Sequence, residues 1–185
     1  MKGKKFPKIP LMCESAFKEL FLKDNNFSAN YSIAWNVKGL ALTIRIEDSD
    51  FIPPPKTPVF WQNDSIVVYF GDKKTAKDGI KEYQSTDVGY RIAQVQGEPV
   101  VQMGEDCKII DSVKAKIYRE NGWTIYELFF PKEELTQIKM QTLDSCSFSM
   151  EAINCDTSTR RAVFTPHAAH PHMNPFVWSD LILIK

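Results

Sequence analysis

The sequence predicts an all-β domain built as an antiparallel two-sheet β-sandwich. About ten short segments are rich in β-branched and aromatic residues, and turn residues separate them. Almost no segment shows the period of an amphipathic helix. A chain of 185 residues is long enough for one domain with a real core and short for two. We therefore expect residues 1–185 to form a single domain.

Residues 1–29 are expected to form an N-terminal arm. Pro7 and Pro10 forbid a helix near the start. Ser15–Lys23 is predicted to make one or two helical turns before the first strand. The segment Lys8–Cys13 follows a lysine-rich start, but it is too short and too broken for the apolar core of a signal peptide. Any export signal is therefore expected to have been removed or to lie outside this chain.

The first hairpin is predicted between Tyr31 and Ile46. Tyr31–Asn36 has the composition of a strand, Val37–Gly39 that of a turn, and Leu40–Ile46 that of the returning strand. Alternation in the second strand places four apolar residues on one face, namely Leu40, Leu42, Ile44 and Ile46. Three carboxylates in Glu47–Asp50 end this strand, and Pro53–Pro55 predicts an extended loop.

The next strand is Ser65–Phe70, in which every side chain after the serine is β-branched or aromatic. Ile66, Val68 and Phe70 share one face, and the alternate residues are also largely apolar, so both faces of the sheet are expected to be covered here. Trp61 precedes this strand, where an indole can stay partly open to solvent and stack on a sugar or a partner. The alternative is that Trp61 seals the end of the core.

Later segments continue the all-β pattern. Asn121-Gly122 is a strong hairpin signal, Pro131–Leu135 resembles a single helical turn, and Gly71–Gly79 is expected to be a surface loop. The remaining strands are expected at Gly89–Val95, Val100–Met103, Ile109–Tyr118, Trp123–Phe130, Cys146–Asn154 and Leu181–Ile184.

Composition excludes several partners and sites. The 23 basic residues balance the 23 acidic ones, so we expect no nucleic-acid binding by bulk charge. No apolar run reaches the about 18 residues of a membrane span. The four cysteines lack zinc-ligand spacing, and the sequence leaves open whether any of them form disulfides. These residues are Cys13, Cys107, Cys146 and Cys155.

Four successive blocks carry a resemblance to a known family. They are Ile33–Asp48, Phe60–Phe70, Gly122–Pro131 and Asn174–Leu183. Their order and spacing over residues 30–185 resemble the family 9 carbohydrate-binding modules. The resemblance implies a jelly-roll-like β-sandwich that is non-catalytic and binds a polysaccharide or oligosaccharide. It also implies attachment to a glycoside hydrolase and a secreted, periplasmic or cell-surface location.

The resemblance also implies a ligand site that holds a glycan end between two aromatic rings. Trp61 stands where the family has its first clamping tryptophan, and Arg91 where it has an arginine that hydrogen-bonds hydroxyls. The second tryptophan is replaced by His172, and Trp178 matches the aromatic residue before the last strand. Two polar positions of the family are replaced here by Val67 and Ala93. The implied ligand-binding residues are Trp61, Asn63, Arg91 and His172.

Sugar chemistry explains why these residue types matter. A pyranose presents an apolar face of C–H groups bordered by hydroxyls, so an indole covers the face while charged or amide groups bind the rim. Stacking on one aromatic ring contributes about 1–3 kcal/mol by analogy with nucleic-acid platforms. A single tryptophan therefore predicts weak binding, in the millimolar range.

Two metal sites are alternatives at this stage. Asp48 and Asp64, together with Asp50, could supply oxygen ligands to a structural Ca²⁺, as the resemblance implies. The competing interpretation is that these aspartates only accept hydrogen bonds in turns. The histidine-rich loop His167–His172 could hold a metal, although no cysteine lies nearby.

Two other function classes are weaker. A glycoside hydrolase needs two carboxylates about 5–10 Å apart, and only Glu127 and Glu151 are candidates within strands. No G-x-S-x-G motif supports a nucleophilic enzyme. The replaced tryptophan and Val67 favour a third class, in which the sandwich has lost its groove and serves as a structural or protein-interaction module.

Overall fold

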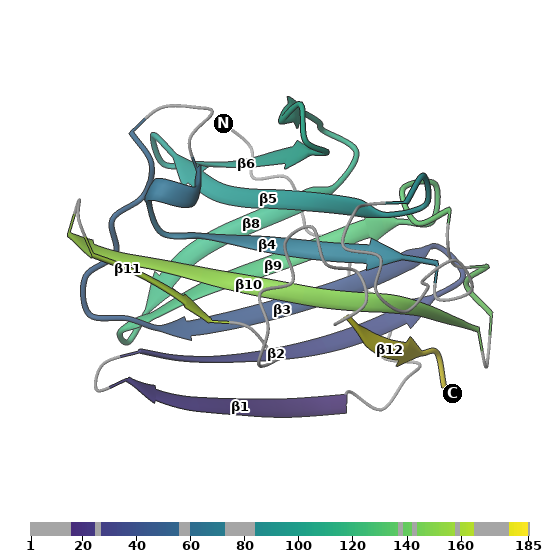
Figure 1. The fold of residues 1–185 in the computed structure, drawn as a ribbon, viewed down its shortest axis with the longest axis horizontal. Coiled ribbons are helices and arrows are strands. Elements are labelled where there is room, and N and C mark those ends of the chain that lie inside the picture. Colours follow the sequence, from purple (N-terminus) through teal and green to yellow (C-terminus); the bar gives the residue numbers. More distant parts are fainter. Residues whose placement is uncertain are drawn as a thin grey trace.

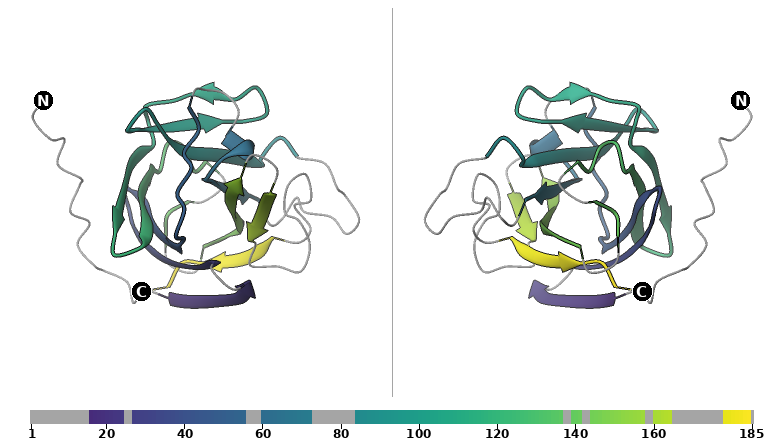
Figure 2. Two further views of the ribbon diagram at one scale, coloured as in Figure 1. Left: turned by 90° about the vertical axis from the view of Figure 1, so that its left-hand side faces the viewer. Right: turned by 90° about the vertical axis from the view of Figure 1, so that its right-hand side faces the viewer.

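The computed structural model shows two antiparallel β-sheets packed face to face (Figures 1 and 2). It describes residues 16–24, 27–55, 60–72, 84–136, 139–141, 144–157, 160–164 and 178–184. No α-helix occurs in these ranges, and no helix there is long and apolar enough to cross a membrane. The prediction of an all-β two-sheet sandwich is confirmed.

The first sheet has the strand order β1-β2-β3-β9-β8. Its strands are β1 (Ala16–Asp24), β2 (Phe27–Asn36), β3 (Gly39–Glu47), β8 (Lys114–Glu120) and β9 (Trp123–Pro131). The β2–β3 pairing confirms the first predicted hairpin. Asn121 and Gly122 join β8 to β9 with φ angles of 51° and 82°. Both angles lie in the left-handed region that a type I′ hairpin turn requires, as predicted.

The second sheet has the order β11-β10-β4-β5-β6-β7, and β12 pairs with β10. The strands of this sheet are β4 (Ser65–Gly71), β5 (Val88–Val95), β6 (Glu98–Met103), β7 (Lys108–Ile109), β10 (Ser145–Thr157), β11 (Arg160–Phe164) and β12 (Ser179–Ile182). A short 3₁₀ turn, η1 (Phe60–Gln62), precedes β4 in the chain. In Figure 1, β10, β4 and β5 lie side by side along the length of the molecule.

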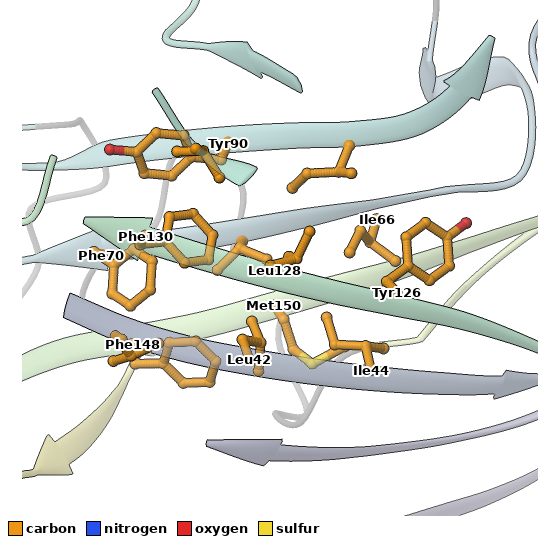
Figure 3. Packing of buried hydrophobic residues seen from close by; sticks show 14 of the residues in the cluster. Leu42, Ile44, Ile66, Phe70, Tyr90, Tyr126, Leu128, Phe130, Phe148 and Met150 are labelled. Atoms are coloured by element: carbon orange, nitrogen blue, oxygen red, sulfur yellow. The ribbon is translucent and has the colours of Figure 1, made fainter. Parts of the chain in front are cut away.

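The core lies between the two sheets. The predicted apolar row of β3 is buried, and it faces the residues of β4 and β10 that point inward. Figure 3 shows Phe70, Phe130 and Phe148 at one end of this core and Tyr126 at the other. The ring of Phe70 lies 5.1 Å from that of Phe130 and 5.5 Å from that of Phe148, measured between centroids.

Strand β4 is covered on both faces, as its composition predicts. Ile66, Val68 and Phe70 point into the core. Val67 and Tyr69 belong to a second buried apolar cluster on the other face of the sheet. We call it the outer apolar cluster; its members are Val67, Tyr69, Ile153, Cys155 and Trp178.

The predicted helical turns at Ser15–Lys23 are wrong, because Ala16–Asp24 forms strand β1 at the edge of the first sheet. Its residues include good helix formers, but pairing with β2 decides the conformation. Local propensity is weak compared with such tertiary contacts. Pro131–Leu135 is a pair of turns rather than a helical turn, with Glu134 N–H donating to Pro131 and Leu135 N–H to Lys132.

The single strand predicted at Ile109–Tyr118 is also wrong. It is two strands in different sheets, β7 and β8. Ile110 N–H still donates to Val101 in the second sheet, at 3.0 Å, and the chain then crosses to the first sheet. Val113 is buried at the crossing. Strand β11 was not predicted, and the loop predicted at Gly71–Gly79 lies, beyond Asp72, outside the described residues.

Candidate functional site

Four residues form one row across the outer face of the second sheet, the face turned away from the core. Strand register places Glu151 opposite Val67, Val67 opposite Arg91, and Arg91 opposite Gln102. Directly opposed residues of a sheet point to the same side. Because Val67 belongs to the outer apolar cluster, the whole row points outward. We call these four residues the Arg91 row.

The Arg91 row combines a carboxylate, a guanidinium and an amide. Glu151 is 2% exposed and Gln102 is 0% exposed, while Arg91 is half-buried. Arg91 Nη1 donates to the carbonyl oxygen of Gly104, which follows β6. The guanidinium is therefore directed toward the β6 side of β5. Together these groups offer both donors and acceptors, as the binding of hydroxyl groups requires.

The outer apolar cluster lies beside this row. The rings of Tyr69 and Trp178 stack at a centroid distance of 5.3 Å with an interplanar angle of 28°. Gly71 makes this possible, because a Cβ there would lie 2.9 Å from the Trp178 ring and 2.2 Å from a carboxylate oxygen of Asp87. Trp178 is 6% exposed, so it packs against the sheet.

The turn η1 holds the backbone of Trp61 at the start of β4. The hydroxyl of Ser65 donates to the carbonyl oxygen of Phe60 at 2.8 Å, and the N–H of half-buried Asn63 donates to the same oxygen at 3.1 Å. This turn also contacts β5, the strand of Arg91. The side chain of Trp61 lies outside the described residues, as does the whole of His167–His172. The structure therefore tests neither predicted aromatic wall.

Arg91 is engaged by a backbone carbonyl group. Asp87, just before β5, makes a different contact, because one of its carboxylate oxygens accepts from Gln84 N–H at 2.8 Å. Burial raises the pKa of Asp87, and Asp72 adds to this, while the Gln84 hydrogen bond opposes it. The guanidinium of Arg91 is thus fixed by the β6–β7 turn.

Asp48 and Asp64, the predicted calcium ligands, are both buried near Tyr126. Asp64 accepts hydrogen bonds from the N–H groups of Ile52 and Cys155, the latter at 2.8 Å. Asp48 accepts from Asp50 N–H at 3.0 Å. Burial and then the charges of Asp64 and Asp48 raise the pKa of Tyr126. No group of three or more His, Cys, Asp or Glu suited to a metal occurs in the part of the chain that the structure describes.

The two glutamates considered for hydrolysis lie on opposite sides of the molecule. Glu127 is on β9 and points outward from the first sheet, where it pairs with Lys116 at 3.5 Å and accepts from Tyr118 at 3.1 Å. Glu151 points outward from the second sheet. Packed sheets lie about 10 Å apart, and both side chains point away from the space between them. Glu127 and Glu151 therefore do not form a hydrolytic pair.

The sequence interpretation did not include Glu151 or Gln102 in a ligand site. Glu151 reaches this row through the pairing of β10 with β4 and of β4 with β5, across a long separation in the chain, whereas Gln102 reaches it through the adjacent β5–β6 hairpin. The available signal was the alternation of polar residues within Cys146–Asn154, where Ser147, Ser149 and Glu151 occupy every second position.

The chain is an antiparallel β-sandwich that carries polar and aromatic groups on the outer face of its second sheet. A family model described as "Carbohydrate family 9 binding domain-like" matches residues 7–185. The chain therefore belongs to this family. A comparison with curated proteins finds no match.

Solved structures share the fold. A family 9 carbohydrate-binding module from Caldicellulosiruptor kristjanssonii in complex with glucose has a TM-score of 0.67 and 15% identity, covering 91% of this chain and 83% of that one. The same kind of module in complex with cellotriose gives 0.68 and 16%, covering 92% and 82%. A putative carbohydrate-binding protein from Bacteroides uniformis gives 0.58 and 10%, covering 91% and 86%.

Proposed function

We propose that this domain is a non-catalytic module that binds a carbohydrate on the outer face of the second sheet, at the Arg91 row. The observation that carries the proposal is the alignment of Glu151, Arg91 and Gln102 across three strands of one face. The backbone of Trp61 lies in η1, which contacts the same sheet. Family membership supports carbohydrate binding, and related modules bind glucose and cellotriose.

Arg91 and Glu151 bind the hydroxyl rim in this proposal. A guanidinium donates several hydrogen bonds in a fixed plane, and a carboxylate accepts them. Val67 occupies the position where the family resemblance expects an acidic residue. Glu151 stands directly across the ladder from Val67, at the about 5 Å that separates opposed residues. Compared with the family pattern, the carboxylate therefore lies on the neighbouring strand, β10, and on the same face of the sheet.

Trp61 supplies the aromatic surface in this proposal, and Asn63 lies at its edge. His172 provides the opposite wall as a smaller and more polar ring than tryptophan. One tryptophan contributes about 1–3 kcal/mol of stacking, so the charged rim has to supply much of the selectivity. Binding is expected to be weak, with a neutral glycan or glycan end as the ligand.

We further propose that the domain is attached to a polysaccharide-degrading enzyme and acts outside the cytoplasm, as a secreted, periplasmic or cell-surface module. Asp48 and Asp64 act in this proposal as hydrogen-bond acceptors rather than as Ca²⁺ ligands, because they accept from the N–H groups of Asp50, Ile52 and Cys155, and the described residues hold no group of three ligands that includes them. These hydrogen bonds tie the loop after β3 to the start of β4.

A structural or protein-interaction module is the second candidate. The outer apolar cluster supports it, because Val67 and Trp178 leave part of the sheet face buried rather than open. In this interpretation the Arg91 row is a remnant whose groups are held by internal contacts such as the hydrogen bond to Gly104.

Substitutions at Trp61 and Arg91 separate these candidates. Purified wild type, Trp61→Ala and Arg91→Ala are screened on a glycan array and measured by calorimetry with glucose and cellotriose, beside a reducing-sugar assay. Arg45→Ala is the matched control, because Arg45 stacks on Trp123 at 5.1 Å on the first sheet. We expect both site variants to bind at least about tenfold more weakly, with thermal unfolding nearly unchanged.

Four other outcomes would change the conclusion. Undiminished glycan retention by Trp61→Ala and Arg91→Ala removes the proposed site. A large drop in the unfolding temperature of Trp61→Ala assigns Trp61 to the core. Absence of binding to every glycan on the array favours the structural or protein-interaction module, and release of reducing ends by the wild type would make the domain an enzyme.

A further inference from the structure

Gln102 carries an amide that is buried on the outer face of the second sheet. Its side chain is 0% exposed, and neither its Nε2 nor its Oε1 has a hydrogen-bond partner among the described residues. Val101 before it points into the core, so Gln102 points to the outer face, opposite Arg91. Buried side-chain amides are nearly always hydrogen-bonded in folded proteins, because leaving them without partners destabilises the fold.

The chemistry of Gln102 complements that of its neighbour. A guanidinium only donates hydrogen bonds, whereas a primary amide both donates and accepts. Arg91 donates to Gly104, just beyond the end of β6, so its charged group lies on the side of β5 where Gln102 stands. A hydroxyl group placed between the two residues could accept from Arg91 and donate to the amide oxygen of Gln102.

We propose that Gln102 binds a hydroxyl group of the carbohydrate beside Arg91, as a residue that determines affinity and specificity. This inference rests on the proposed function and assigns a further ligand group to the same face. Hydroxyl groups suit this part of the row, because Arg91 donates hydrogen bonds and the amide of Gln102 both donates and accepts them.

The test uses Gln102→Met, which keeps the length of the side chain and removes both polar atoms. Calorimetry with cellotriose, xylotriose and mannotriose is run on the wild type, Gln102→Met, Gln102→Leu and the control Gln94→Met. Gln94 is a half-buried glutamine of β5 whose amide donates to Gly97 at 3.3 Å. We expect Gln102→Met to weaken binding at least about tenfold, which is 1.4 kcal/mol, while the control binds as the wild type.

Stability distinguishes a ligand-binding amide from a structural one. Replacing an amide that has no partners by an apolar group of similar shape is neutral or stabilising, so the unfolding temperature of Gln102→Met should equal or exceed that of the wild type. A lower unfolding temperature than that of Gln94→Met, or failure of both Gln102 variants to fold, would show that the amide serves the fold and would overturn the assignment.

Failure of the assignment and failure of the proposed function give different results. If the wild type and Arg91→Ala differ in affinity while Gln102→Met binds as the wild type, only the role of Gln102 is lost. If the wild type binds none of the three trisaccharides, a neutral-glycan site at the Arg91 row is lost and the role of Gln102 with it.

Discussion

Asp64 offers a direct test of how the region around the candidate site is held together. Its carboxylate accepts from Ile52 N–H and from Cys155 N–H at 2.8 Å, and its own N–H donates to Ile52 at 2.9 Å. It therefore ties the loop after β3 and strand β10 to the start of β4. Asp64→Asn removes one of the two acceptor oxygens and Asp64→Ala removes both, so the two substitutions weaken this connection in two steps.

The expected magnitude follows from these contacts. A hydrogen bond to a charged group contributes about 1.5–3 kcal/mol, so losing two costs about 3–6 kcal/mol in Asp64→Ala. The free energy of unfolding of a domain is only about 5–15 kcal/mol in total. At about 2–4 °C per kcal/mol for a domain of this size, the unfolding temperature should fall by at least about 6 °C. Asp64→Asn keeps one acceptor oxygen and should lose about half as much.

Thermal and urea unfolding measure this loss, with Asp50→Asn as the control. Asp50 lies in the loop after β3, the loop that Asp64 holds, and its side chain is exposed. Its replacement should therefore change the free energy of unfolding by less than about 0.5 kcal/mol. An Asp64→Ala variant as stable as the control would refute the reasoning. A chelator that lowers the unfolding temperature of the wild type but not of Asp64→Asn would show that Asp64 also holds Ca²⁺.

Two further predictions concern the core and its thiols. Phe70→Ala should lose about 3–5 kcal/mol in urea unfolding, because Phe70 packs against three other rings. Val37→Ala, at a site 72% exposed, should be neutral, and equal losses would contradict this. Burial, with nearby carboxylates adding to it, raises the pKa of Cys146 to about 12. The preference of the folded state for the protonated thiol therefore contributes fully to stability below about pH 8.5, and this contribution is lost as the pH rises toward 12. Peptide mass spectrometry should find half-exposed Cys107 alkylated by iodoacetamide at pH 8 and Cys146 intact, and alkylation of native Cys146 would contradict its burial.

Much of the fold could be predicted because the deciding signals are local. The alternation in Leu40–Ile46 predicts its buried face, and the Asn121-Gly122 pair predicts the turn between β8 and β9. The errors arise where distant pairing decides. Ala16–Asp24 becomes a strand by pairing with β2, and Ile109–Tyr118 divides because the chain leaves one sheet for the other.

The candidate site could be predicted only in part, for the same reason. Arg91 is predicted to lie near the ligand, and the structure places it on an outer face, but the carboxylate of its row comes from a strand far away in the sequence. Glu151 is 60 residues from Arg91 in the numbering, and only the order β10-β4-β5 brings the two into one row. No spacing within a single segment carries that information.

The replacement at Val67 therefore does not by itself remove the polar character of the face. In a sheet, a side chain one strand away in the same row, at about 5 Å, lies closer than one two positions along the same strand, at about 7 Å. Moving the carboxylate from β4 to Glu151 on β10 keeps it on the surface that carries Arg91, while Val67 packs with Tyr69 and Trp178. Of the four residues of the row, Arg91 alone is half-buried rather than buried, so a ligand would reach the row first at Arg91, beside the apolar Val67.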